Sequence, residues 1–196
     1  MTKPLHTLVL GGQKSGKSRH AEQCAADWLG AAPGHRALLL ATAEAGDAEM
    51  AARIARHQVD RAARVPGLAT LDVPQQHGGD LARAIRLHSA PSQLLVVDCL
   101  TLWLTQLLMP LQGPAPDDGL LQPRLDGLLQ ALEAAPGPVL WVSNEIGLGI
   151  SPLGREVRRF VDVLGSLHQR LAARCQRVQL LVAGCVLDVK HEGRAA

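Results

Sequence analysis

Residues 11–18, with the sequence GGQKSGKS, constrain the fold of this chain more than any other segment. They match the pattern G-x-x-x-x-G-K-S and lie between an apolar run at 6–10 and a stretch of helical character at 18–29. Glycines in such a loop let backbone N–H groups wrap around a phosphate at the start of a helix. The segment therefore predicts nucleoside triphosphate binding. The alternative, a glycine-rich turn that only begins a helix, is disfavoured by the position, spacing and flanks of the motif.

Short apolar runs alternate with stretches of helical period along the rest of the chain. We expect strands at 6–10, 37–43, 68–73, 93–98, 139–143 and 178–183, with an added edge strand at 186–189. We expect helices at 18–29, 47–61, 80–88, 100–108, 120–134 and 157–174, and a surface loop at 110–119. Strands that are apolar throughout indicate a parallel sheet covered by helices on both faces. The predicted fold is one α/β domain over residues 1–196, a doubly wound, mostly parallel sheet of the P-loop NTPase class.

The composition excludes several classes of protein. The 196 residues are 47% apolar and 19% charged, which excludes a disordered chain, and a net charge of +2 argues against a dedicated nucleic-acid binder. Three Trp, one Phe and no Tyr leave little material for stacking bases. No apolar stretch reaches the roughly 18 residues of a membrane span. The four cysteines have no C-x-x-C spacing, which predicts reduced thiols and a cytoplasmic protein.

The motif and one strand end predict specific roles. Lys17 is expected to reach the β- and γ-phosphates and Ser18 to ligate Mg²⁺. Asp98 ends the apolar strand at 93–98, where such folds place the carboxylate that holds Mg²⁺; alternatively, it caps the helix that follows. These features predict a protein that binds a nucleoside triphosphate with Mg²⁺. They leave kinase, nucleotidyltransferase, motor and switch functions open.

Four longer segments resemble one known family. Their sequences are GGQKSGKSRHAE at 11–22, ATAEAGDAEMAARIARH at 41–57, VDCLTLWL at 97–104 and VSNEIGLG at 142–149. Together they resemble the bifunctional adenosylcobinamide kinase / adenosylcobinamide-phosphate guanylyltransferase family of cobalamin biosynthesis, nearly from end to end of the chain. The resemblance implies a RecA-like domain and a cyclic homotrimer. It implies phosphorylation of the corrinoid adenosylcobinamide by ATP or GTP, and then GMP transfer from GTP with release of pyrophosphate.

The resemblance also implies the residues of the site. In the family, GMP transfer passes through a covalent guanylyl-histidine, which falls here on His57. A neutral imidazole is a competent nucleophile near pH 7, and Arg53, Arg56 and Arg61 can steady phosphate charge. From composition alone, a solvated helix carrying one of 8 histidines is the better interpretation. The expected nucleotide-binding residues are Gly11, Gly12, Gln13, Lys14, Ser15, Gly16, Lys17, Ser18, Ala41, Thr42, Ala43, Gln58, Val59, Asp60, Arg61, Asp72 and Asp98.

Three further residues are candidates for substrate contact. Asn144 and Glu145 follow a strand end, and Glu145 either meets the corrinoid amides or the reacting hydroxyl or caps the next helix. Arg155 either contacts phosphate or is solvated. The chain departs from the family pattern at Asp72, where Glu is usual, and at His168, where Asn is common. We expect these departures to affect the contacts of the nucleotide base and of the trimer rather than the phosphate chemistry.

Two other functions stay open at this stage. The first is a small P-loop kinase without nucleotidyl transfer. The second is a non-catalytic, GTP-dependent switch, against which the chain has no N-K-x-D guanine-recognition motif. The expected homotrimer rests on the resemblance and on apolar segments such as 100–108, which we expect to be exposed.

Overall fold

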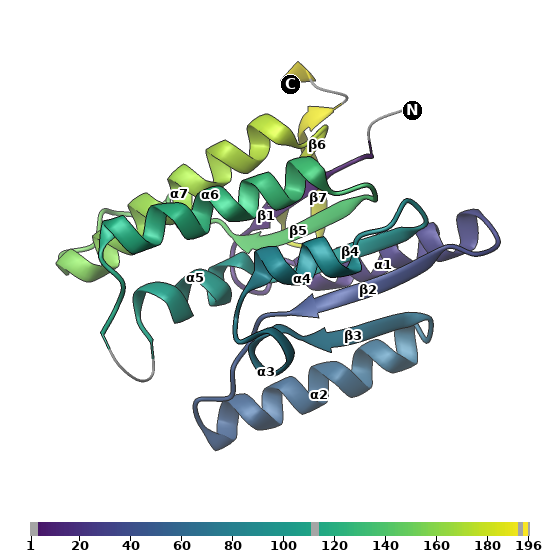
Figure 1. Cartoon of the computed structure of the whole chain (residues 1–196), viewed down its shortest axis with the longest axis horizontal. Helices are drawn as coiled ribbons and strands as arrows, with labels where there is room; N and C mark the ends of the chain where they lie inside the picture. The colour runs from purple at the N-terminus through teal and green to yellow at the C-terminus, as the bar shows by residue number, and fades with distance from the viewer. Residues whose placement is uncertain (1–3, 111–113, 192–193, 196) are drawn as a thin grey trace.

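The computed structural model describes residues 4–110, 114–191 and 194–195 and arranges their strands in a single sheet (Figure 1). The strands are β1 (Thr7–Gly11), β2 (Arg36–Ala41), β3 (Leu68–Asp72), β4 (Gln93–Asp98), β5 (Val139–Asn144), β6 (Arg177–Val182), β7 (Cys185–His191) and β8 (Arg194–Ala195). Their order in the sheet is β3-β2-β4-β5-β1-β6-β7-β8. The first six in that order are parallel, and β7 and β8 continue the sheet antiparallel. The predicted mostly parallel sheet is confirmed, including the added strand after β6.

The helices are α1 (Lys17–Ala31), α2 (Ala48–Arg64), α3 (Val73–His77), α4 (Leu81–His88), α5 (Leu100–Leu108), α6 (Asp118–Ala134) and α7 (Arg155–Arg174). Every predicted helix is present with small shifts at its ends. Helix α3 was not expected, because five residues are too few to show a helical period. The predicted loop at 110–119 ends earlier than expected, since α6 begins at Asp118, and its residues 111–113 lie outside the described residues.

Successive residues of the central strands alternate between two apolar cores, as the period of a strand requires. Leu8 and Leu95 pack with α3 to α7 on one face, whereas Val9 and Val96 pack with α1 on the other. Figure 1 shows α4 to α7 in front of the sheet and α1 behind it. Because both faces are covered, the strands are apolar throughout, and polar side chains gather at their ends.

Helix α5 corrects one expectation. Its residues Leu100, Trp103, Leu104 and Leu108 are buried in the larger core, so the segment 100–108 is not an exposed apolar surface. The positions repeat at the spacing of one helical face, which packs against the sheet. Across the described residues, no helix combines the length and the apolar character needed to cross a membrane.

The buried side chain of His6 predicts a pH dependence of stability. Its Nδ1 accepts a hydrogen bond from the backbone N–H of Val139 at 3.2 Å, which joins the segment before β1 to β5. Burial lowers the pKa of His6 from 6.5 to about 4. Between these values the unfolded chain binds a proton that the folded chain does not, so stability falls as the pH is lowered from 6.5 towards 4.

The loss assigned to His6 amounts to about 3 kcal/mol of unfolding free energy. In His6→Asn, the amide oxygen keeps an acceptor near Val139 but does not titrate. Urea unfolding of both proteins at several pH values between 7.5 and 4.5 should show a flatter pH dependence for the variant. Parallel curves for the two proteins would contradict this assignment.

Candidate active site

The carboxyl ends of β1, β2, β4 and β5 meet at one edge of the sheet. The register of the strands pairs Gly11 with Asn144, Ala41 with Asp98, and Asp98 with Val142. Ligands of parallel sheets bind at this edge, because the loops that leave the strands converge there. The phosphate loop and the carboxylate that the sequence singled out are therefore brought together by the register itself.

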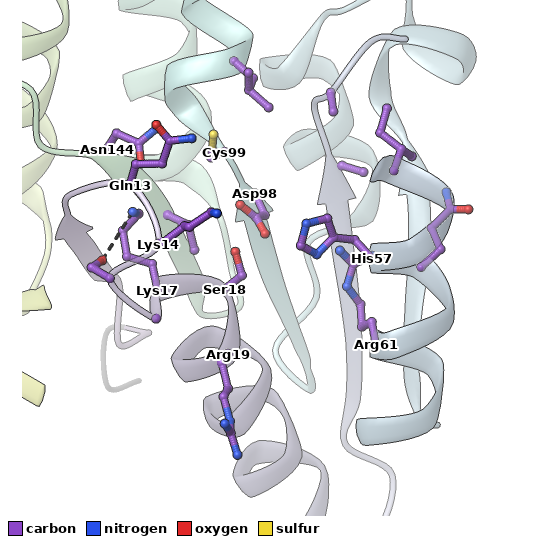
Figure 2. Close-up of a pocket in the computed structure, with 18 of the residues that line it drawn as sticks. Gln13, Lys14, Lys17, Ser18, Arg19, His57, Arg61, Asp98, Cys99 and Asn144 are labelled. Atoms are coloured by element: carbon purple, nitrogen blue, oxygen red, sulfur yellow. Dashed lines mark hydrogen bonds between the residues drawn. The ribbon is translucent and has the colours of Figure 1, made fainter. Parts of the chain in front are cut away.

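A cavity of about 480 Å³ lies at this edge (Figure 2). Its walls come from the phosphate loop, the ends of β2, β4 and β5, and helix α2. The sequence-predicted residues that line it are Gln13, Lys14, Ser15, Gly16, Lys17, Ser18, Ala41, Ala43, His57, Gln58, Arg61, Asp98 and Asn144. The residues that line it without having been expected are Arg19, Met50, Ile54, Cys99, Leu102 and Val142.

The backbone of the phosphate loop needs glycine at two positions. Gly16, the residue before α1, has φ of 100°, which side chains of L-residues rarely adopt. A Cβ on Gly11 would lie 2.6 Å from the carbonyl oxygen of Leu181 on the neighbouring strand. The glycines therefore fit both the turn and the close packing of the loop against β6.

Lys17 is held inside the loop. Its Nζ donates hydrogen bonds to the carbonyl oxygens of Gly11 at 3.0 Å and Gly12 at 2.7 Å. Burial lowers the pKa of Lys17, and the nearby Cys99 and Asp98 oppose this effect. The ammonium group thus lies within the curve of the backbone, where the phosphates of a nucleotide are expected.

Asp98 lies at the centre of the cavity, beside residues of both α1 and α2 (Figure 2). Burial, and to a smaller extent the charge of Glu22, raise the pKa of its carboxyl, whereas a hydrogen bond from Ser18 and the charges of Arg61 and His57 lower it. The Ser18 hydroxyl and the Asp98 carboxylate form a pair of oxygen donors, the ligand type that Mg²⁺ prefers. The pair fits the predicted magnesium site.

One face of α2 supplies the wall opposite the loop. Met50, Ile54, His57 and Arg61 recur at spacings of three and four residues, so they lie on the same face of the helix. Figure 2 shows His57 projecting from α2 towards Ser18 and Asp98. The helical spacing from His57 was the signal that could have identified Met50 and Ile54 from the sequence.

Other predicted residues of α2 do not reach the cavity. Val59 and Asp60 are exposed and fall on other faces of the helix, and Arg56 is also exposed. The side chain of Arg53 lies outside the described part of the chain. Of the expected α2 residues whose side chains the structure describes, His57, Gln58 and Arg61 line the cavity.

Thr42 and Asp72 serve the backbone instead of lining the cavity. The hydroxyl of Thr42 donates to the carbonyl oxygen of Cys99 at 2.7 Å and accepts from its N–H at 2.8 Å, which ties the ends of β2 and β4 together. The carboxylate of Asp72 accepts a hydrogen bond from the N–H of Gln75 at 2.9 Å and so caps α3, which has Pro74 in its first turn. The sequence signal for α3 was this pair of a capping Asp and a following Pro.

Gly11, Gly12, Glu145 and Arg155 also lie outside the cavity lining. Glu145 donates its backbone N–H to Gly11 at 3.0 Å, and its carboxylate accepts from the N–H of Gly147 at 2.6 Å. Arg155 is exposed at the start of α7. Glu145 therefore links the phosphate loop to the segment after β5, and Arg155 remains solvated.

His168, a departure from the family pattern, belongs to a hydrogen-bonded chain behind the site. Its Nε2 lies 2.8 Å from the hydroxyl of Ser143, which lies 3.1 Å from the hydroxyl of Thr101. Thr101 in turn accepts the backbone N–H of Asn144 at 2.8 Å. Burial lowers the pKa of His168, and the carboxylate of Glu145 opposes this effect. This series of hydrogen bonds holds Asn144 at the cavity through groups on α5, β5 and α7.

Comparison with known proteins gives a consistent result. A family model described as "Cobinamide kinase / cobinamide phosphate guanyltransferase" matches residues 7–189. The chain is 44% identical to the "Bifunctional adenosylcobalamin biosynthesis protein CobP" of Pseudomonas aeruginosa, over 96% of this chain and 99% of that protein. It is 37% identical to the "Bifunctional adenosylcobalamin biosynthesis protein CobU" of Salmonella typhimurium, over 93% and 98%, and 34% identical to that of Escherichia coli, over the same shares.

Proposed function

The chain belongs to the cobinamide kinase / cobinamide phosphate guanyltransferase family, and from this premise we propose that it catalyses both reactions on adenosylcobinamide. It would phosphorylate the hydroxyl of the corrinoid with ATP or GTP, and then transfer GMP from GTP to give adenosylcobinamide-GDP and pyrophosphate. The observation that carries the proposal is one cavity in which His57 faces the phosphate loop (Figure 2). Phosphoryl transfer needs no protein nucleophile, whereas GMP transfer through a covalent intermediate does, and the position of His57 suits that role.

The kinase step needs only the loop side of the cavity. Backbone N–H groups of the loop and Lys17 would hold the β- and γ-phosphates while the substrate hydroxyl attacks the γ-phosphorus in line. Ser18 and Asp98 would hold Mg²⁺, which when bound neutralises part of the phosphate charge. Positioning and charge supply the catalysis, so no protein nucleophile is required.

The guanylyl step adds the α2 side of the cavity. A ring nitrogen of His57 would attack the α-phosphorus of GTP, forming a phosphorus–nitrogen bond as the bond to the bridging oxygen breaks and pyrophosphate leaves. A phosphate oxygen of adenosylcobinamide phosphate would then attack the same phosphorus and restore the histidine. Arg61, which also lines the cavity, would offset the negative charge that develops on the phosphates.

Two properties of the chain in the cell belong to the same proposal. The four cysteines are free, which suits a reducing compartment and supports a cytoplasmic location.

The segment between β5 and α7 supports the homotrimer that the resemblance implies. Leu148, Ile150 and Leu153 there are 82%, 98% and 96% exposed, and large apolar side chains grouped in this way are typical of subunit contacts.

Replacing His57 should separate the two reactions. In His57→Asn we expect GMP transfer to fall by a factor of about a thousand or more, while phosphorylation of adenosylcobinamide stays within about threefold. The measurement is protein-bound label after incubation with α-³²P-GTP and an alkaline quench, beside a kinase assay. His20→Asn is the control, because His20 contacts Gln179 and does not line the cavity. Label retained by His57→Asn would contradict the proposal.

Replacing Asp98 tests the magnesium site. Asp98→Asn keeps the shape of the side chain and removes the charge that holds a hard cation. We expect the magnesium concentration for half-maximal turnover to rise about tenfold or more, while nucleotide affinity in the absence of the metal changes little. The matched control is Asp117→Asn, a helix-capping carboxylate distant from the cavity. Identical magnesium titrations for wild type and Asp98→Asn would contradict a role of Asp98 in holding the metal.

Sedimentation equilibrium tests the oligomer. At micromolar concentration the wild-type protein should show three times the 20.8 kDa mass of the chain. Ile150→Asp should shift the distribution towards the monomer, because the change places a charge in the proposed contact. A wild-type monomer at this concentration would contradict the proposed homotrimer.

A further inference from the structure

Helix α2, which carries His57, is held to the domain in an unusual way. Of its described side chains only Arg61 is buried, at 8% exposure, and Met50 and Ile54 are half-buried. A helix of 17 residues at the side of a sheet is normally held by an apolar stripe that packs into the core. The α2 helix runs along β3 at the edge of the sheet (Figure 1), and charge rather than apolar packing joins it to α1.

The charge that holds α2 belongs to Glu22 on α1. Glu22 is 5% exposed, and its carboxylate accepts two hydrogen bonds from Arg64, from Nε at 2.7 Å and from Nη2 at 3.2 Å. Its other close cation is Arg61, whose Nε lies 3.7 Å away. A buried carboxylate is stable only when it is paired, so removing these partners would leave an uncompensated charge. Glu22 therefore binds α2 to the helix that begins at the phosphate loop.

The two arginines share this carboxylate unequally. Arg64 donates hydrogen bonds to both carboxylate oxygens of Glu22, and this bidentate geometry is the strongest for an arginine–carboxylate pair. Arg61 keeps donors available: among the described residues its buried Nε makes no hydrogen bond, and its Nη1 makes only a long one of 3.4 Å to Thr70. Glu22 thus orients the guanidinium of Arg61 towards the cavity and leaves N–H groups of Arg61 available to bind a ligand.

The same cluster sets the position of His57. Arg61 lies one helical turn after His57 on the cavity face of α2, and Glu22 lies one turn after Ser18 on α1. Figure 2 shows His57 and Arg61 projecting together from α2 towards the start of α1. The spacing between the phosphate loop and the imidazole therefore depends on the contact of Glu22 with the two arginines.

We propose that Glu22 is a positioning residue for guanylyl transfer: through Arg64 it fixes α2, and through Arg61 it orients the cavity face that carries His57. This inference rests on the proposed function. As proposed, the kinase step relies on the loop side of the cavity, so we expect the loss of Glu22 to weaken guanylyl transfer more than phosphorylation. Glu22 itself does not line the cavity and touches no reacting atom.

The first test is Glu22→Gln, which keeps the shape of the side chain and removes its charge. At saturating GTP, the rate of guanylyl-protein formation should fall by about tenfold or more, and the kinase rate should stay within about twofold. Asp27→Asn is the matched control, since Asp27 is exposed on the same helix and, among the described residues, accepts one side-chain hydrogen bond, from Gln23 at 2.9 Å. Circular dichroism and the thermal midpoint report whether each variant is folded.

The second test is Arg64→Gln: the side chain of Arg64 is 43% exposed, so its loss opens no cavity in the core, and Arg61 remains beside Glu22 to compensate its charge. Without Arg64, Glu22 should draw Arg61 into a close ion pair, and the KM for GTP in guanylyl transfer should rise by about fivefold or more. The kinase KM should be unchanged. In the double variant Glu22→Gln with Arg64→Gln, the combined loss should be smaller than the product of the two single losses, because both act through one cluster.

Three outcomes of these variants, and one of the wild-type protein, would overturn the inference. Guanylyl transfer at the wild-type rate in both single variants would show that Glu22 positions nothing. Equal losses in the kinase and guanylyl reactions would show a structural role only, and independent effects in the double variant would show that the two residues do not act together. If the wild-type protein itself forms no GMP adduct while its kinase reaction proceeds, the proposed guanylyl mechanism fails, and this inference fails with it.

Discussion

A parallel sheet that is buried on both faces places its polar side chains where its strands end. Here that constraint places the polar and charged residues of the site at one edge of the sheet, where the register puts Gly11 beside Asn144 and Asp98 beside Ala41. The hydroxyl of Thr42 locks two of these ends to each other. The loop side of the cavity is consequently tied to the core beneath it, which suits reactions that depend on the placement of phosphates.

The opposite wall of the cavity, helix α2, is held by ion pairs rather than by apolar packing. Helix α2 has little apolar contact with the domain, and its buried arginine and the carboxylate of Glu22 take the place of a core. Charge pairs hold geometry through direction more than through burial, so they can hold α2 in place while His57 stays exposed to the cavity. In the mechanism that we propose, the loop wall would serve both reactions, and the α2 wall would serve the transfer of GMP.

Much of this arrangement follows from the sequence, because strand periodicity and the loop motif are local signals. They predict the sheet, the helices and the places of Lys17 and Asp98, whereas the role of His57 came from family resemblance. Contacts between distant segments leave no such signal: the pairing of Glu22 with Arg64 joins residues 42 positions apart. The burial of 100–108 was also missed, since a single sequence does not distinguish a helix face that packs in the core from one that packs on a partner.

The central claim is that the cavity makes His57 a covalent carrier of GMP. Its most direct test is peptide mass spectrometry of the wild-type protein after incubation with GTP and Mg²⁺, with digestion kept at alkaline pH because phosphorus–nitrogen bonds are labile in acid. We expect a GMP adduct on the peptide that contains His57, and loss of that adduct after brief acid treatment. An adduct on another residue, or one that survives acid, would contradict it.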